Sequence, residues 1–180
     1  STDERLILAA CELFARNGFQ RTTTQMICEE AEANIGAVNY YYGGKENLYL
    51  AVWERLHRQV SRRIQDLLDA GEGLTPEEKL GLHIQMRVRS VMSDGEPGWF
   101  GRLIHWEMTQ PTPVHEEIEQ RFLKNLQDHF QKLTRGIVGE DIDDKTARLA
   151  DFCVQSPIIH FSEIMRTPGI KPHLRERLAA

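Results

Sequence analysis

Residues 22–45 read TTTQMICEEAEANIGAVNYYYGGK and hold two segments of helical character, each about two turns long. The threonines that open the stretch can cap the first segment, which we expect over residues 25–31. Asn34 can cap the second segment, expected over residues 35–41, and the glycines at 43–44 end it. Helices this short bury little surface alone, so the pattern predicts a helix-turn-helix packed on a preceding helix.

Helical spacing recurs on both sides of this stretch. An apolar stripe predicts a first helix over residues 3–17, which Gly18 ends as a C′ glycine would. A long amphipathic helix is expected from residue 45 to the break at 71–73. Further helices are expected over residues 75–93, 99–108, 114–138 and 141–160. No segment shows the apolar–polar alternation of half-buried strands, so the predicted fold class is all-α.

Composition narrows the classes of function. The chain has 180 residues, 41% of them hydrophobic and 27% charged, which is typical of a globular protein with a sizeable core. Its three cysteines are far apart, as in a reducing cytosol, and we expect a cytoplasmic protein without membrane partners. The formal net charge of −5 disfavours nucleic-acid binding through bulk charge but leaves a small, sequence-specific surface open. Because the chain starts at Ser1, some N-terminal residues are expected to be missing.

The chemistry-bearing residues do not form a catalytic or metal-ligating pattern. The seven histidines never occur four residues apart, and no HExxH, GxSxG or glycine-rich phosphate loop is present. Cys153 and His160 are seven residues apart on one expected helix, too far for a nucleophile and its base. The sequence therefore predicts a protein that is not an enzyme and that needs no cofactor or metal.

The second short helix has an unusual polar side. Val38 and Tyr42 are four residues apart and can face the core, which leaves five residues exposed: Gly36, Ala37, Asn39, Tyr40 and Tyr41. Asparagine can bind adenine through two hydrogen bonds, and alanine can meet a thymine methyl group. Tyrosine and threonine hydroxyls suit phosphate oxygens. On spacing alone, a tyrosine-rich packing segment with a polar rim remains an alternative.

Four strings together resemble the TetR family of transcriptional repressors: residues 14–19, 22–27, 34–42 and 44–49. The resemblance covers about residues 3–55 without interruption. It implies an all-helical homodimer in which a three-helix DNA-binding domain joins a larger helical domain that binds a small-molecule inducer and dimerises. Carried onto this chain, the domains are residues 1–48 and 49–180.

The resemblance also assigns DNA-binding residues. Thr23 and Thr24 match phosphate-contacting positions, and Tyr41 and Lys45 match phosphate clamps. The recognition helix is matched by Asn34, Ile35, Gly36, Ala37, Asn39 and Tyr40.

Three positions depart from the family pattern: Glu32 stands where glycine is frequent, Gly43 where proline is common, and Ile35 where lysine is frequent. Residues 1–50 hold four basic and seven acidic side chains, a net charge of −3. We therefore expect modest non-specific affinity for DNA.

Beyond residue 55 the composition predicts a pocket for an apolar or aromatic ligand with one or two hydrogen-bonding groups. The candidate lining residues are Met86, Trp99, Phe100, Leu103, His105, Trp106, Phe122, Phe130 and His160. The alternative is the ordinary core of a helical bundle.

An association surface is expected within residues 143–165, where Leu149, Phe152, Cys153, Ser156, Ile159 and Ile164 form an apolar stripe. Intramolecular packing is the alternative. The family usually has a well-formed final helix, and we expect the short tail 174–180 to leave the dimer interface incomplete.

The predicted function is a ligand-responsive repressor that binds a pseudo-palindromic operator in double-stranded DNA as a homodimer and is released by a small inducer. The alternative is a helical ligand-binding or adaptor protein that has lost sequence-specific DNA reading, which the acidic N-terminal region favours.

Overall fold

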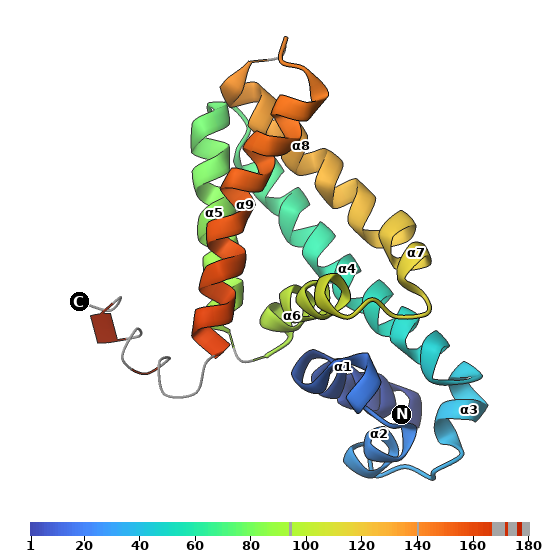
Figure 1. Cartoon of the computed structure of the whole chain (residues 1–180). Coiled ribbons are helices and arrows are strands. Elements are labelled where there is room, and N and C mark those ends of the chain that lie inside the picture. The colour runs from blue at the N-terminus through green and yellow to red at the C-terminus, as the bar shows by residue number, and fades with distance from the viewer. Residues whose placement is uncertain (94, 140, 167–171, 173–175, 178–180) are drawn as a thin grey trace. The chain divides into compact units, whose positions relative to one another are not determined.

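The computed structural model describes residues 1–93, 95–139, 141–166, 172, 176 and 177 (Figure 1). Within these residues the regular structure is helical and no strand occurs, which confirms the predicted all-α class. In chain order the helices are α1 (Thr2–Arg21), α2 (Thr24–Glu30), α3 (Ala37–Tyr42), α4 (Lys45–Ala70), α5 (Pro76–Met92), α6 (Glu96–Thr109), α7 (His115–Ile118), the π-helical turn η1 (Glu119–Leu123), α8 (Lys124–Val138) and α9 (Asp144–Arg166). Among the described helices, none combines the length and the apolar character needed to cross a membrane.

The chain divides into two compact units. Unit 1 comprises Ser1–Gln65 and Ser93–Asn125, and unit 2 comprises Asp66–Met92 and Leu126–Ala180. Helix α4 belongs to unit 1 up to Gln65, and its last residues belong to unit 2. These units are defined by packing, whereas the boundary at residue 48 comes from the family resemblance and stays a prediction.

The turn after the first helix forms around Gly18, whose φ of 77° lies in the left-handed region. The prediction of a break at this glycine is confirmed, but the chain then makes one more helical turn to Arg21. Thr22 fixes that turn, because its buried hydroxyl shares its one proton between the carbonyls of Gly18 at 2.8 Å and Leu13 at 3.2 Å.

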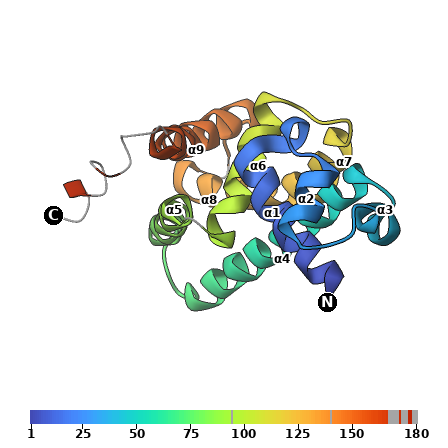
Figure 2. The same ribbon diagram turned by 90° about the horizontal axis from the view of Figure 1, so that it is seen from below.

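The core of unit 1 is built where α1 packs on α2 and α6 (Figure 2). Its largest fully buried side chains include Phe14, Tyr49 and Trp53. The rings of Phe14 and Tyr49 meet edge to face at 4.9 Å, and that of Trp53 lies edge to face with Phe100 at 5.5 Å. This aromatic core holds the N-terminal end of α4 against α1.

Several helix boundaries differ from the predicted ones. Helix α6 begins at Glu96 rather than residue 99, because Pro97 is tolerated in a first turn. The single helix predicted over 114–138 is instead α7, η1 and α8 in succession. Helix α9 starts after Asp143, which caps it by accepting a 2.9 Å hydrogen bond from the Thr146 amide, and it continues through Pro157 to Arg166.

Unit 2 contains α5, α8 and α9, and α5 lies beside α9 (Figure 1). The predicted start of α5 at Thr75 is confirmed as a reciprocal cap with Glu78. The Glu78 amide donates to the Thr75 hydroxyl at 3.3 Å, and the Thr75 amide donates to the Glu78 carboxylate at 2.8 Å. Apart from residues 176 and 177, the tail 174–180 lies outside the described residues.

Candidate nucleic-acid interface

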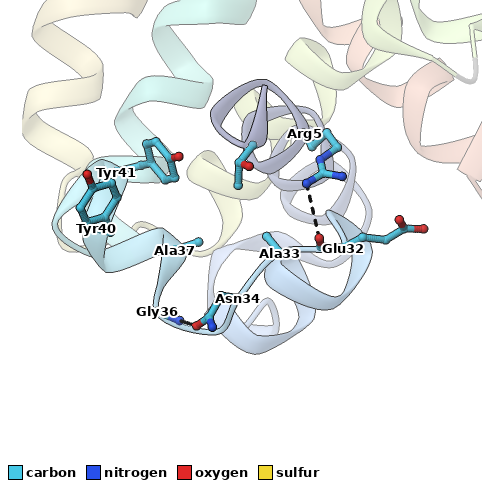
Figure 3. A pocket seen from close by; sticks show the side chains of 9 residues that line it. Arg5, Glu32, Ala33, Asn34, Gly36, Ala37, Tyr40 and Tyr41 are labelled. Carbon is cyan, nitrogen blue, oxygen red and sulfur yellow. Dashed lines mark hydrogen bonds between the residues drawn. The ribbon is translucent and has the colours of Figure 1, made fainter.

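The turn between α2 and α3 is set by Glu32, a non-glycine residue with a φ of 48°. This left-handed backbone explains why glycine suits the position, since a Cβ atom there costs about 1–2 kcal/mol. The Glu32 carbonyl accepts a hydrogen bond from the Arg5 guanidinium at 3.4 Å. Figure 3 shows the Glu32 carboxylate directed away from Tyr40 and Tyr41, so the acid does not point into the surface that these residues form.

Asn34 shapes the start of α3. Its side-chain oxygen accepts a 3.0 Å hydrogen bond from the Gly36 amide, and its carbonyl accepts one of 2.8 Å from the Ala37 amide. The helix therefore begins at Ala37, two residues later than predicted, because residues 34–36 form the capping turn. Gly43, with a φ of 76°, ends α3 as predicted.

The outer side of α3 carries large exposed side chains. Tyr40 is 83% exposed, Ile35 65% and Tyr41 47%, and the two tyrosine rings meet edge to face at 5.0 Å. Asn39 is also exposed. The prediction that Ala37 is exposed is wrong, because Ala37 is the first residue of α3, directly after the turn from α2, and is only 6% exposed there.

The inner side of α3 holds the helix in place. Val38 is buried as predicted. The half-buried Tyr42 donates a short hydrogen bond from its hydroxyl to the carboxylate of Asp3, at the start of α1. Burial and the Asp3 side chain raise the pKa of Tyr42, so the hydroxyl remains a donor.

A shallow hollow of about 410 Å³ lies between the start of α1 and α3 (Figure 3). Its lining consists of Thr2, Arg5, Glu32, Ala33, Asn34, Gly36, Ala37, Tyr40 and Tyr41. Five of these residues are predicted DNA-binding positions. Thr2 and Arg5 were not predicted, since the approach of the start of α1 to α3 is a tertiary contact that spacing does not reveal.

The other predicted DNA-binding residues are not part of the lining of the hollow. Thr23 is exposed and caps α2 by accepting a 3.1 Å hydrogen bond from the Met26 amide. Thr24, half-buried, begins α2. Lys45 begins α4 with its ammonium group 4.1 Å from the centre of the Phe19 ring, and partial burial lowers its pKa. The side chains of Thr23 and Lys45 thus each have a local contact that fixes their direction.

Trp106 lies at the contact between α6 and α1. Its indole nitrogen donates a 3.1 Å hydrogen bond to the Ala15 carbonyl, and its ring covers Gly18 so closely that a Cβ atom there would lie 3.0 Å away. The guanidinium of Arg21 stands over the same ring, 5.0 Å from its centre. The sequence predicts Trp106 as a ligand-binding residue, and the structure places it where α6 meets α1.

The residue next to Trp106 is the fully buried Glu107. Its carboxylate accepts hydrogen bonds from the Tyr49 hydroxyl at 3.1 Å and from both the amide and the hydroxyl of Thr112 at 2.9 Å. A ring nitrogen of His115 lies 3.1 Å from the same carboxylate. Sequence reasoning missed this buried centre, because Tyr49 is 58 positions from Glu107.

The nine predicted ligand-binding residues are divided between the units. In unit 1, Trp99, Phe100, Leu103 and Phe122 are buried, while His105 and Trp106 are half-buried. The rings of Phe100 and Phe122 lie 5.5 Å and 6.1 Å from Trp53, so both belong to the aromatic core. In unit 2, Met86 and Phe130 are half-buried and His160 is exposed. The ligand-binding role of all nine stays a prediction.

Two protein-family models match the chain one after the other. The model described as bacterial regulatory proteins, tetR family, matches residues 6–52. The model of the C-terminal domain of the HTH-type transcriptional dual regulator CecR matches residues 76–168, just over half of the chain. The first match contains the helix-turn-helix described above, and the second contains α5 to α9.

Curated relatives carry similar descriptions. The HTH-type transcriptional dual regulator CecR of Shigella flexneri is 24% identical over 166 residues, which are 88% of this chain and 74% of the relative. A fatty acid metabolism regulator protein of Bacillus subtilis (strain 168) is 27% identical over 90 residues, 50% of this chain and 45% of the relative. The chain thus spans less than half the length of the second relative.

Solved structures share the fold. The transcriptional regulator FadR from Bacillus subtilis, in complex with stearoyl-CoA, aligns with a TM-score of 0.71 at 21% identity, over 91% of this chain and 86% of that one. HlyIIR, a hemolysin II transcriptional regulator, aligns with a TM-score of 0.69 at 19% identity, over 95% of this chain and 93% of that one.

Proposed function

The chain belongs to the TetR family of bacterial regulatory proteins, and on this premise we propose that it represses transcription by binding an operator as a dimer. A small ligand then releases it from the DNA. Membership of the family makes the chain a transcriptional regulator, and its relatives are named as regulators rather than enzymes.

The observation that carries the proposal is the exposed side of α3. A tyrosine that is 83% exposed contributes little to the core, and the adjoining Tyr41 and Asn39 are exposed too. On a helix-turn-helix, such side chains are available to base edges and phosphate oxygens in a major groove. Asn39 supplies a donor and an acceptor for adenine, and the tyrosines and Arg5 supply donors for phosphates.

The proposed release runs through α6. Because Trp106 is hydrogen-bonded to Ala15 and packed on Gly18, a displacement of α6 moves the contact that holds α1. A ligand shifts the population toward the DNA-free state only as far as it binds that state more tightly. We assign ligand binding to the C-terminal region, with the nine predicted residues as candidates.

The ligand is proposed to be largely apolar. The aromatic and aliphatic candidates supply the apolar surface, and His105 and His160 supply polar groups. The related FadR structure holds stearoyl-CoA, a molecule with a long apolar chain, which supports this class of ligand for a relative with the same fold.

The rival is a ligand-binding or adaptor protein that no longer reads DNA. Residues 1–50 carry seven acidic and four basic side chains, which weakens attraction to phosphates. The exposed tyrosines favour the repressor, because an adaptor has no need of a polar, aromatic recognition helix.

Selection of bound duplexes from a randomised DNA pool tests the proposal. We expect an enriched inverted repeat from the purified chain at moderate salt. The variant Asn39→Ala is expected to lose about 1–3 kcal/mol of preference at one base pair in each half-site. The matched control Gln20→Ala changes an exposed residue at the end of α1 and should select the same repeat. Selection without enrichment, or identical selection by Asn39→Ala, contradicts the assignment of α3 as the reading helix.

A further inference from the structure

Unit 2 contains a group of buried nitrogen atoms that the proposed DNA surface does not use. His83 and Arg87 are one helical turn apart on α5, and His129 lies on α8. His83 is fully buried, and its ring lies 4.3 Å from that of Phe130, at an angle of 49°. The ring of Phe130 is in turn edge to face with that of His129 at 5.6 Å. The two histidines therefore share one aromatic neighbour, Phe130 of α8.

The polar atoms of this group lack partners in the described part of the protein. Both ring nitrogens of His83, Nε of Arg87 and Nε2 of His129 are buried without a hydrogen bond. A buried polar atom without a hydrogen bond destabilises the folded protein, so native proteins seldom keep several together without a reason. In a neutral His83 ring one nitrogen donates and the other accepts, so these atoms supply up to three donors for a group that they would bind.

The charged groups that shift the pKa values of these side chains are basic. Burial, together with the charges of Arg87 and His129, lowers the pKa of His83 to about 3. Burial followed by the charge of Lys132 lowers the pKa of His129, and burial lowers that of Arg87. At neutral pH the group thus consists of a guanidinium cation and two neutral imidazoles, each of which can donate one N–H.

No carboxylate completes the group within the described residues. The ion pairs found there do not include Arg87. Asp151 on α9 has a buried Oδ1 without a hydrogen-bond partner, and its side chain interacts with Gln155. An isolated cation and several donors, with no acceptor paired to them, are complementary to an anion.

We propose that Arg87, His83 and His129 bind the anionic group of an organic ligand whose apolar part packs against Phe130. The planar guanidinium offers two parallel N–H groups to a carboxylate or a phosphate, and each neutral imidazole adds one donor. Ligand binding itself needs no DNA. The identification of this anion as the effector that releases DNA rests on the proposed function.

The first test measures the cost of the unpaired cation. Arg87→Met keeps the length of the side chain and removes its charge, so thermal unfolding of the ligand-free full chain should occur at a higher temperature than in the wild type. The matched control is Arg89→Met, which changes an exposed arginine two residues later on α5 and should leave the temperature unchanged. A lower unfolding temperature for Arg87→Met overturns the proposal, because it shows that Arg87 already has a stabilising partner.

The second test compares decanoate with decanol by titration calorimetry, since the two probes share one apolar body and differ in charge. The wild type and Arg89→Met should bind decanoate about 10- to 100-fold more tightly than decanol. Arg87→Met should bind both alike. Equal affinities in the wild type, or binding of neither probe, overturn the proposal.

Two further arms refine the result. If Arg87→Met does not fold, Arg87→Lys can replace it, because lysine keeps the charge but lacks the planar guanidinium. Decanoate should bind to Arg87→Lys about tenfold more weakly than to the wild type. Unchanged affinity contradicts a role for the guanidinium.

Acetate and inorganic phosphate, compared at equal ionic strength, distinguish a carboxylate ligand from a phosphate ligand, because the anion that binds raises the unfolding temperature. If neither does, the proposal fails, and because none of these measurements uses DNA, operator selection can still succeed or fail independently.

Discussion

Single residues determine the turn that positions the recognition helix. Glu32 adopts a left-handed backbone, and its carbonyl is held by Arg5 at 3.4 Å. Its exposed carboxylate meanwhile adds negative charge to a region that the proposed function brings close to phosphates. Because the backbone strain and the negative charge both come from Glu32, one substitution removes both.

Glu32→Gly is therefore expected to stabilise the protein and to strengthen DNA binding. Relief of the left-handed Cβ contributes about 1–2 kcal/mol, part of which is lost to the greater freedom of glycine in the unfolded chain. The control Glu30→Gly removes the same charge from the last residue of α2, where the backbone is helical, and should destabilise the protein by up to about 1 kcal/mol. Urea denaturation of the three proteins checks the opposite signs, and two destabilised variants would contradict the strain at Glu32.

His83 predicts a dependence of stability on pH. Its folded-state pKa of about 3 lies below the ordinary 6.5, so between these values the unfolded chain binds a proton that the folded chain does not. Stability is therefore complete above pH 6.5 and falls as the pH is lowered through this window, by at most about 1.4 kcal/mol per pH unit.

Denaturation at several pH values between 4 and 7 measures this slope. His83→Leu should flatten it relative to the wild type, whereas His160→Gln, at an exposed position, should not. The acidic residues titrate in all three proteins, so the difference in slope isolates His83. If the pH dependence of stability is the same in His83→Leu and in the wild type, the prediction is wrong.

At the scale of elements, α6 and α1 are joined by a contact that tolerates no extra atom. The Trp106 ring covers Gly18, and Gly18 adopts a φ of 77° that only glycine adopts without strain. The Tyr49–Glu107 hydrogen bond ties the next residue of α6 to α4. The C-terminal half of α6 is thus fixed to two helices of the N-terminal region.

Gly18→Ala should break this contact. The added Cβ meets the Trp106 ring at 3.0 Å and requires an unfavourable φ, at a combined cost of about 1–3 kcal/mol. Gly101→Ala is the matched control, because no atom lies within 4 Å of its Cβ and alanine favours the interior of α6. Chemical denaturation compares the two; equal stabilities would show that α6 yields at Trp106 without cost.

The elements differ in how far the sequence predicts them. Helices with a local cap or an apolar stripe, such as α5 with its Thr75 and Glu78 pair, were predicted well because their determinants are neighbours in sequence. The π-helical turn η1 was not predicted. The burial of Glu107 was not predicted either, because it depends on Tyr49, a partner far along the chain. On α3, spacing predicted the exposure of Tyr40 and Tyr41 correctly but also predicted an exposed Ala37, which is buried.

At the scale of the whole molecule, a dimer is needed for a symmetric operator, and α9 offers a surface for it. Phe152 is 65% exposed and Leu149 56%, and they are three residues apart on one side of the helix. Apolar side chains this exposed on the same face favour contact with a second copy. The side chain of Ile159, also predicted in this stripe, lies outside the described residues.

Phe152→Asp should therefore separate the subunits without unfolding them, because the residue contributes little to the core of its own chain. Sedimentation should show a dimer for the wild type and for Gln20→Asp, an exposed control in α1, and a monomer for Phe152→Asp. Loss of the second half-site contact should weaken operator binding, since two linked DNA-binding domains bind about 10²- to 10⁴-fold more tightly than one. A Phe152→Asp protein that remains dimeric would place the interface elsewhere, and a monomeric wild type would remove the basis for a pseudo-palindromic operator.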